Sequence, residues 1–165
     1  MAPKPFLLNA DDVGWERRAH GQTAVEEQHL SLAMRSRKLS YGITAIAPGA
    51  RSFPFHFHHD NEEMFVILSG TGQVRIGDIV SPIRSGDVIS CPAGPGGVHQ
   101  FINDGAESLR YLAVGTMAAP DVIEYPDSDK VNVIAGTAAG GDKGQRTFSG
   151  VFPKRATVDY WEGEA

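Results

Sequence analysis

Apolar residues occur along the chain in short runs, many of which alternate with polar residues. Eight such runs lie between residues 39 and 116: LSYGITAIA, FPFHFH, EMFVILSG, GQVRIG, IVSPI, DVISCP, HQFIN and SLRYLAVG. The segments between them, such as APGARS, RSGD and PAGPGG, are rich in residues that favour turns. Short strands at this spacing are typical of a β-sandwich or a small barrel, so the pattern predicts an all-β core over residues 39–116.

The N-terminal extension, residues 1–38, has a weaker pattern. Its segments VGWERRA and VEEQHLSLAM are each compatible with a helical turn or with a short edge strand. The first residues contain no apolar stretch of the length that a secretion signal requires, and nothing later approaches a membrane span. We therefore expect a protein that is neither secreted nor membrane-spanning.

The C-terminal extension, residues 117–165, opens with the loop-like AAPDVIEYPDSDK and continues through the glycine-rich AGTAAGGDKG. A connection of this length without structure is uncommon inside a compact domain. We expect the extension either to pack over the barrel or a partner, or to form a partly mobile tail. Four aromatic residues near its end, Phe148, Phe152, Tyr160 and Trp161, favour docking onto a surface.

Composition and charge narrow the classes of function. The 165 residues suit one domain, and 19 glycines with 10 prolines agree with a β-rich fold. The net charge is −5 and the longest basic run is RSRK at 35–38, so nucleic acid and anionic membranes are not expected partners. Cys91 is the only cysteine, which excludes an intrachain disulfide and favours the reducing cytoplasm. Its apolar surroundings indicate a buried thiol at a strand end rather than a nucleophile.

Candidate chemistry is concentrated in PFHFHHDNEE at 54–63. Successive side chains of a strand point to opposite faces, so His56 and His58 share one face. If the chain then reverses as a hairpin, Glu63 lies opposite the two histidines and all three side chains reach a common point. That point could hold a metal ion. A histidine pair of this kind is by itself a weak signal.

A second segment, GDVISCPAGPGGVHQFIN at 86–103, joins two strands through a Pro-Gly turn. Together with it, H-x-H-x4-E-x6-G at 56–70 and G-x5-P-x-G-x4-H-x3-N at 86–103 resemble the two signature motifs of the cupin superfamily. The resemblance covers residues 40–115. It implies a double-stranded β-helix, also called a jelly-roll barrel, with short extensions at both ends. It also implies one divalent metal ion bound by His56, His58, Glu63 and His99.

Two positions depart from the cupin motifs or leave a choice. The gap between the last motif glycine and His99 is four residues, where the family pattern has two. An even number of extra residues in a turn leaves the faces of the following strand unchanged, so His99 stays the expected ligand. In the first motif Glu62 competes with Glu63. Only Glu63 has the six-residue gap to Gly70, and Glu62 points to the opposite face.

The ligand set determines which chemistry is expected. Three imidazoles and one carboxylate suit Mn, Fe, Co, Ni or Zn and leave two positions of an octahedron open for water or substrate. The chain resembles small bacterial cupins described as sugar-phosphate-isomerase-like, which implies an isomerase of a small polyhydroxylated or sugar-phosphate-like substrate. Two alternatives stay open: a metal-dependent dioxygenase of a small organic substrate, and a non-catalytic protein that binds a small sugar or acid.

A few further side chains are candidates for supporting roles. Arg75 would clamp a carboxylate or phosphate of the substrate if its face of the strand is inward. His59 has the wrong parity for a ligand and is expected at the solvent or behind the ligands. His20 and His29 are expected at the surface, and Asn103 is expected to fix a turn.

The last expectation concerns the oligomeric state of the protein. Cupins commonly pair, and the aromatic C-terminal segment needs a surface to cover, so we expect a homodimer.

Overall fold

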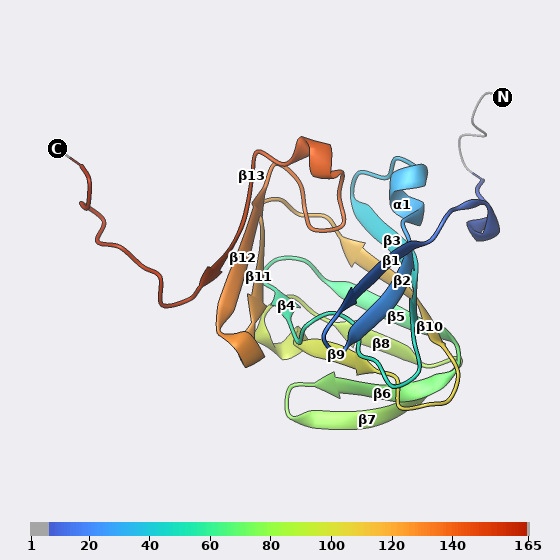
Figure 1. Cartoon of the computed structure of the whole chain (residues 1–165). Helices are drawn as coiled ribbons and strands as arrows, with labels where there is room; N and C mark the ends of the chain where they lie inside the picture. The colour runs from blue at the N-terminus through green and yellow to red at the C-terminus, as the bar shows by residue number, and fades with distance from the viewer. Residues whose placement is uncertain (1–6, 165) are drawn as a thin grey trace.

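The computed structural model describes residues 7–164 and consists mainly of antiparallel β-strands (Figure 1). The strands are β1 (Glu16–His20), β2 (Thr23–Gln28), β3 (Leu39–Ile46), β4 (Phe57–His58), β5 (Glu63–Ser69), β6 (Thr71–Ile76), β7 (Ile79–Arg84), β8 (Val88–Cys91), β9 (His99–Ile102), β10 (Leu109–Thr116), β11 (Asp121–Tyr125), β12 (Lys130–Ala135) and β13 (Phe148–Pro153). The short helices are α1 (Leu30–Ala33) and the 3-10 helices η1 (Ala10–Asp12), η2 (Pro95–Gly97), η3 (Pro126–Ser128) and η4 (Lys143–Gln145). The predicted all-β jelly-roll class is confirmed.

The strands form two opposed walls. One wall is a six-stranded sheet with the order β1-β2-β3-β10-β5-β8. The other wall consists of the sheets β13-β12-β11-β4 and β7-β6-β9, which are joined by an antiparallel bridge between His56 and His99. All named strand pairs are antiparallel.

The hydrophobic core lies between the six-stranded sheet and the β7-β6-β9 sheet. Ile46, Ile67 and Leu109 come from the first sheet and Phe101 from the second, and all four side chains are almost fully buried. The inward residues alternate with outward ones, as the period-two runs in the sequence predict. The cavity adjoins this core, because the core residues Phe65, Phe101 and Tyr111 also line it.

One local prediction is wrong: β4 and β5 do not form a hairpin. β4 pairs with β11, whereas β5 pairs with β8 and β10 in the opposite wall. The turn between them crosses from one wall to the other and is anchored by Asn61. The side-chain Oδ1 of Asn61 accepts hydrogen bonds from Thr116 Oγ1 and Ala118 N at the end of β10. Glu63 therefore faces the histidines across the barrel, not along one sheet.

The C-terminal extension is more ordered than its sequence indicates. The segment DVIEY, expected as part of a loop, forms β11, because β4 on one side and β12 on the other satisfy its backbone hydrogen bonds. The division of the chain at residues 38 and 116 stays a sequence-based prediction. Beyond β13 the chain runs away from the body of the molecule (Figure 1).

Candidate metal centre

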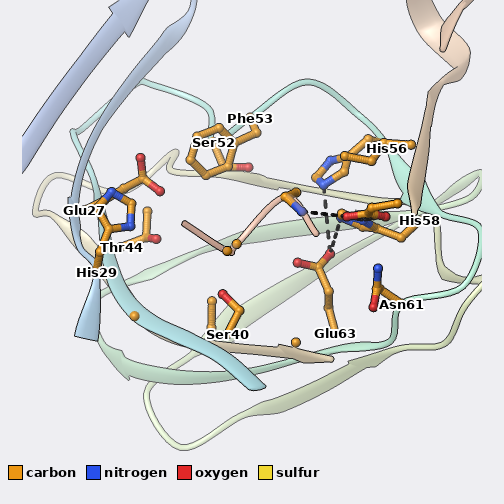
Figure 2. Close-up of a pocket in the computed structure, with 18 of the residues that line it drawn as sticks. Glu27, His29, Ser40, Thr44, Ser52, Phe53, His56, His58, Asn61 and Glu63 are labelled. Atoms are coloured by element: carbon orange, nitrogen blue, oxygen red, sulfur yellow. Dashed lines mark hydrogen bonds and ion pairs between the residues drawn. The ribbon is translucent and has the colours of Figure 1, made fainter. Parts of the chain in front are cut away.

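The four residues expected to bind a metal lie together at the inner end of the barrel cavity. Glu63 Oε2 lies 3.5 Å from His58 Nε2, 3.4 Å from His99 Nε2 and 3.9 Å from His56 Nε2. Figure 2 shows Glu63 pointing from one wall toward His56 and His58 on the other. The longer turn before His99 forms η2 and does not displace this side chain from the group.

In each imidazole the nitrogen that faces away from Glu63 is hydrogen-bonded to an oxygen atom, and this bond orients the ring. His56 Nδ1 lies 2.8 Å from the Pro54 carbonyl oxygen, and His99 Nδ1 lies 2.9 Å from the Gly97 carbonyl oxygen. His58 Nδ1 lies 3.0 and 3.2 Å from the two carboxylate oxygens of Asp121. Because these oxygens can only accept, each Nδ1 carries the proton and the Nε2 lone pairs face the centre in the neutral rings.

The protonation states of the three histidines differ. Burial, assisted by the neighbouring His99 and His58, lowers the pKa of His56 to about 3. Burial also lowers the pKa of His99, against the opposing effect of Glu63. Burial works in the same direction on His58, but the hydrogen bond to Asp121 and the charges of Glu63 and Asp121 outweigh it and raise its pKa. In the metal-free protein the lowered pKa values of His56 and His99 favour their neutral forms, whereas the raised pKa of His58 favours its doubly protonated form more than in an ordinary histidine.

The donor set fits a divalent cation. Glu63 Oε2 is buried and has no hydrogen-bond partner among residues 7–164. The ligand atoms of His56, His58 and Glu63 all lie within 4.8 Å of one another. Metal–ligand bonds of about 2.0–2.2 Å bring neighbouring donors to about 3 Å, so small side-chain shifts would complete such a site. A bound cation would satisfy the buried carboxylate oxygen and the three nitrogen lone pairs together.

The centre opens into a cavity of about 880 Å³ between the two walls. Its floor is formed by small residues of β3 and β10, namely Ser40, Gly42, Ala113 and Gly115. Gly115 pairs with Ser40 on one side and Glu63 on the other. Larger side chains in this row would fill the space beside Glu63, so the small residues are what leave the cavity open.

Comparison with known proteins agrees with this geometry. Residues 42–115 match the family described as Cupin domain. This segment is a cupin domain. The chain is similar over 94% of its length to a candidate sugar phosphate isomerase from Acidithiobacillus ferrooxidans, with 25% identity, a TM-score of 0.77 and 97% of that chain covered.

Two further solved structures resemble this cupin. A cupin-superfamily sugar phosphate isomerase from Silicibacter pomeroyi matches 92% of this chain and 94% of its own, with 20% identity and a TM-score of 0.75. A predicted oxalate decarboxylase from Thermotoga maritima matches 67% of this chain and 98% of its own, with 26% identity and a TM-score of 0.58. No curated protein matches the chain significantly. Within residues 7–164 no helix of this cupin has the length and apolarity needed to cross a membrane.

Arg75 is not among the residues that line the cavity, so its face of β6 is not the inward face on which substrate clamping depended. Val74 points into the core, which turns Arg75 to the outer face of β6. Its guanidinium makes a bidentate ion pair with Asp127, at 2.7 and 3.1 Å, and lies 3.6 Å above the Phe55 ring. The guanidinium is thus already engaged by a carboxylate and an aromatic ring.

His59 and Glu62 face away from the ligand side chains, as the alternation of side chains predicts. His59 points outward and its Nε2 lies 2.8 Å from Glu124 Oε1. Glu62 is exposed, whereas Glu63 faces the centre. His20 is exposed as expected, but His29 is not a simple surface residue. It lines the cavity and pairs with Glu16 at 3.2 Å.

Cys91 and Asn103 have the structural roles expected from the sequence. Burial, together with the charge of Glu63, raises the pKa of the Cys91 thiol to about 12, so its reactive thiolate form is disfavoured. Asn103 is fully buried and donates hydrogen bonds to the carbonyl oxygens of Ile46 and Glu107. Its Oδ1 accepts from Gly105 N, which fixes the turn after β9.

The cavity lining also includes residues that were not found from the sequence, among them Asp121, Tyr125, Asn132 and Arg146. The first two lie in a segment expected as loop, although its alternation of Asp121, Ile123 and Tyr125 is a usable strand signal. Asn132 and Arg146 lie farther along the C-terminal extension and carry no local motif. Their positions depend on how β12 and the loop after it pack over the cavity.

Proposed function

We propose that this cupin is a mononuclear divalent-metal enzyme of the isomerase type that acts on a small polyhydroxylated or sugar-phosphate-like substrate. The supporting observation is that three oriented Nε2 atoms and one unpartnered carboxylate oxygen meet at the end of a cavity. His56, His58, Glu63 and His99 would hold the ion, which is Mn, Fe, Co, Ni or Zn. The likeness to the Acidithiobacillus ferrooxidans protein supports the reaction class.

The cavity suits a substrate of this kind. A volume of about 880 Å³ lies within the range of small-molecule sites. A divalent ion bound at one end would supply a Lewis acid for a carbonyl and its neighbouring hydroxyl. A ligand set of four leaves open positions for two substrate oxygens, in contrast to a closed structural site.

An isomerase also needs a group that moves protons, and Tyr125 is the side chain we propose for it. Tyr125 lines the cavity, and its ring is stacked beside the His56 ring with centroids 6.0 Å apart. Burial raises the pKa of Tyr125 against the opposing effect of a hydrogen bond with the Asn132 side chain, so the phenol is protonated at neutral pH. In this position it can donate a proton or a hydrogen bond to a substrate oxygen next to the ion.

The test has two stages. Protein purified without chelator is first analysed for bound metals. Sugars, sugar phosphates and small acids are then screened with the loaded protein, both in air and without oxygen. Turnover that is independent of oxygen supports the isomerase. Turnover that consumes oxygen would replace it with the dioxygenase, and tight binding without turnover would replace it with a non-catalytic sugar- or acid-binding protein.

A further inference from the structure

The cavity contains buried polar atoms that the metal centre does not explain. Among residues 7–164, five side-chain atoms are buried without a hydrogen-bond partner: Glu27 Oε2, Glu63 Oε2, Arg110 Nε, Asn132 Oδ1 and Arg146 Nε. Four of these five residues line the cavity, and Arg110 is the exception. Buried polar groups normally have partners, so a cluster around one cavity indicates that a ligand supplies them.

Two of the four cavity atoms are accounted for by a charged partner, and two are left without any partner among residues 7–164. Glu63 belongs to the metal centre, and Glu27 Oε2 lies 2.8 Å from Arg18 Nε in an ion pair. The others are Asn132 Oδ1, which can only accept a hydrogen bond, and Arg146 Nε, which is a cationic donor. The ligand must therefore offer a donor to Asn132 and an acceptor, preferably an anion, to Arg146.

Asn132 lies in the same wall as the histidines. It pairs with Ile123 of β11, and Ile123 pairs with His58 of β4, so the three residues form one row across the sheet. Directly paired residues point to the same face. Two inter-strand spacings, about 10 Å in all, separate the backbones of Asn132 and His58. A chain of several hydroxyl-bearing carbons spans such a gap.

Arg146 lies in the loop between β12 and β13, which packs against the cavity near β3. Its Nη2 donates to the Ala139 carbonyl oxygen at 3.2 Å, and Ala139 N donates to Asp121 Oδ2 at 2.9 Å. No carboxylate within residues 7–164 forms an ion pair with Arg146. By contrast, Arg18 and Arg75 are both paired with acids.

Lys143 of the same loop also lines the cavity. Asp142 lies beside it, but the Asp142 Oδ1 accepts a hydrogen bond from Gly144 N at 2.9 Å. Arg146 and Lys143 therefore place two cations of one loop at the cavity, where the charge of Lys143 also acts on Glu27. A guanidinium can bind two oxygens of one phosphate or carboxylate.

We infer that the cavity binds an anionic polyol, with a terminal phosphate or carboxylate at Arg146 and Lys143 and a hydroxyl donating to Asn132 Oδ1. The inference deepens the proposed function because the rest of the polyol would reach the metal centre. The anion subsite itself does not require the metal. A phosphate and a carboxylate of the ligand would both form the same kind of ion pair with Arg146, so binding experiments with each anion are needed to distinguish them.

The first experiment titrates metal-free protein with inorganic phosphate and with acetate at millimolar concentration, followed by amide NMR. We expect saturable shifts at residues 139–146 with at least one anion, and their loss in Arg146→Met. Arg17→Met is the matched control, since Arg17 is exposed and does not line the cavity. The inference is overturned if neither anion causes saturable shifts in the wild type, or if the Arg146 variant responds like the control.

The second experiment measures binding of ribose, ribose 5-phosphate and ribonate to metal-loaded protein by calorimetry. We expect one anionic sugar to bind about tenfold or more tightly than ribose, and Arg146→Met to remove that advantage. Asn132→Leu should weaken binding of the preferred anion without changing metal affinity. Equal binding of all three compounds contradicts the inference. Metal affinity is measured separately in each variant, so a failure of the metal centre is distinguished from a failure of the anion subsite.

Discussion

At the scale of single residues, Asp121 shows why the site was predicted only in part. The ligand positions were found because the spacing of His56, His58, Glu63 and His99 is a sequence pattern. Asp121 lies 63 residues from His58, yet its carboxylate holds the His58 ring and accepts from Ala139 N. Strand alternation says which face a side chain takes, but not which distant strand becomes its neighbour.

The first prediction concerns the ligands. His58→Ala or His99→Ala removes one nitrogen from the set, so the affinity for a divalent metal should fall by more than the roughly 10- to 100-fold typical of losing a supporting residue. The barrel should stay folded, because its apolar core includes neither histidine, although the His99 ring packs against Phe65 and Phe101 of that core. Metal titration against a competing chelator, with circular dichroism for folding, makes the measurement.

His59→Ala and Glu62→Ala are the matched controls, since these residues adjoin the ligands but face outward. Both should keep wild-type metal affinity. Equal losses in controls and ligand variants would refute the assignment of the four residues as ligands.

The second prediction concerns pH. The proton on His58 competes with the metal, and its pKa is raised above the ordinary 6.5 by Asp121 and Glu63 against the effect of burial. Metal affinity should therefore decline as pH falls through a value above 6.5. His56, with a pKa of about 3, contributes nothing in that range. In the metal-free protein the sign is opposite: the raised pKa stabilises the fold below pH 6.5, and this stabilisation is lost as pH rises through the folded-state pKa.

Asp121→Asn tests the cause of this shift. The carboxylate charge is removed while an oxygen acceptor can remain, so burial should dominate and the pKa of His58 should fall. The midpoint of the affinity–pH curve should move to lower pH, while affinity at high pH drops about 10- to 100-fold. An unchanged midpoint, measured by chelator competition across the pH range, would show that Asp121 does not control the proton on His58.

The third prediction concerns Tyr125. Tyr125→Phe removes the phenolic oxygen and keeps the ring beside His56, so metal affinity should be unchanged while kcat for the identified substrate falls about 100-fold. Tyr41→Phe is the control, because Tyr41 also lines the cavity but its hydroxyl already bonds Ser36 Oγ at 2.8 Å. A kcat loss that is equal in both variants would argue against Tyr125 as the proton donor.

At the scale of secondary structure, the strands of the core were predicted well and their partners were not. The apolar runs of β5 to β10 are continuous or alternate clearly, and glycine or proline marks their ends. The hairpin between β4 and β5 was wrong because β4 has only two residues, and its partner β11 follows much later in the chain. The predicted alternation of side chains was correct in β4 and in β5. The histidines and Glu63 therefore face one another, although the predicted pairing of the two strands was wrong.

The fourth prediction concerns the turn formed by η2. Gly97 supplies the carbonyl oxygen that orients His99, and a Cβ at this position would overlap the Pro92 carbonyl oxygen. Gly97→Ala should therefore shift the turn, release His99 and lower metal affinity about 10- to 100-fold without unfolding the protein. Gly96→Ala is the neighbouring control, since nothing lies within 4 Å of its Cβ position. Equal metal affinity in the two variants would show that the turn does not position His99.

At the scale of the whole molecule, the exposed apolar side chains include two local groups. One is the C-terminal segment, in which β13 exposes Phe148 and Phe152, and the C-terminal arm, defined as residues 154–164, exposes Tyr160 and Trp161. The other lies on β7 and β8 and includes Ile79, Val80 and Val88. β13 is an edge strand, and an exposed apolar edge is normally covered in a stable protein. The arm extends from the body of the molecule (Figure 1). Within it the Tyr160 and Trp161 rings pack edge to face, with centroids 4.8 Å apart.

The last prediction is that a second copy of the chain covers the C-terminal arm. Aromatic side chains are strong anchors of protein interfaces, and an arm that leaves its own body is free to lie on a partner, so we expect a homodimer. Light scattering should give twice the chain mass of 17.7 kDa, and a chain ending at Pro153 should give the monomer mass with metal affinity kept. Ile79→Ser with Val80→Ser, at the other exposed place, should leave the dimer intact. A wild-type monomer, or a dimer lost only in the Ile79 and Val80 variant, would remove the arm as the interface.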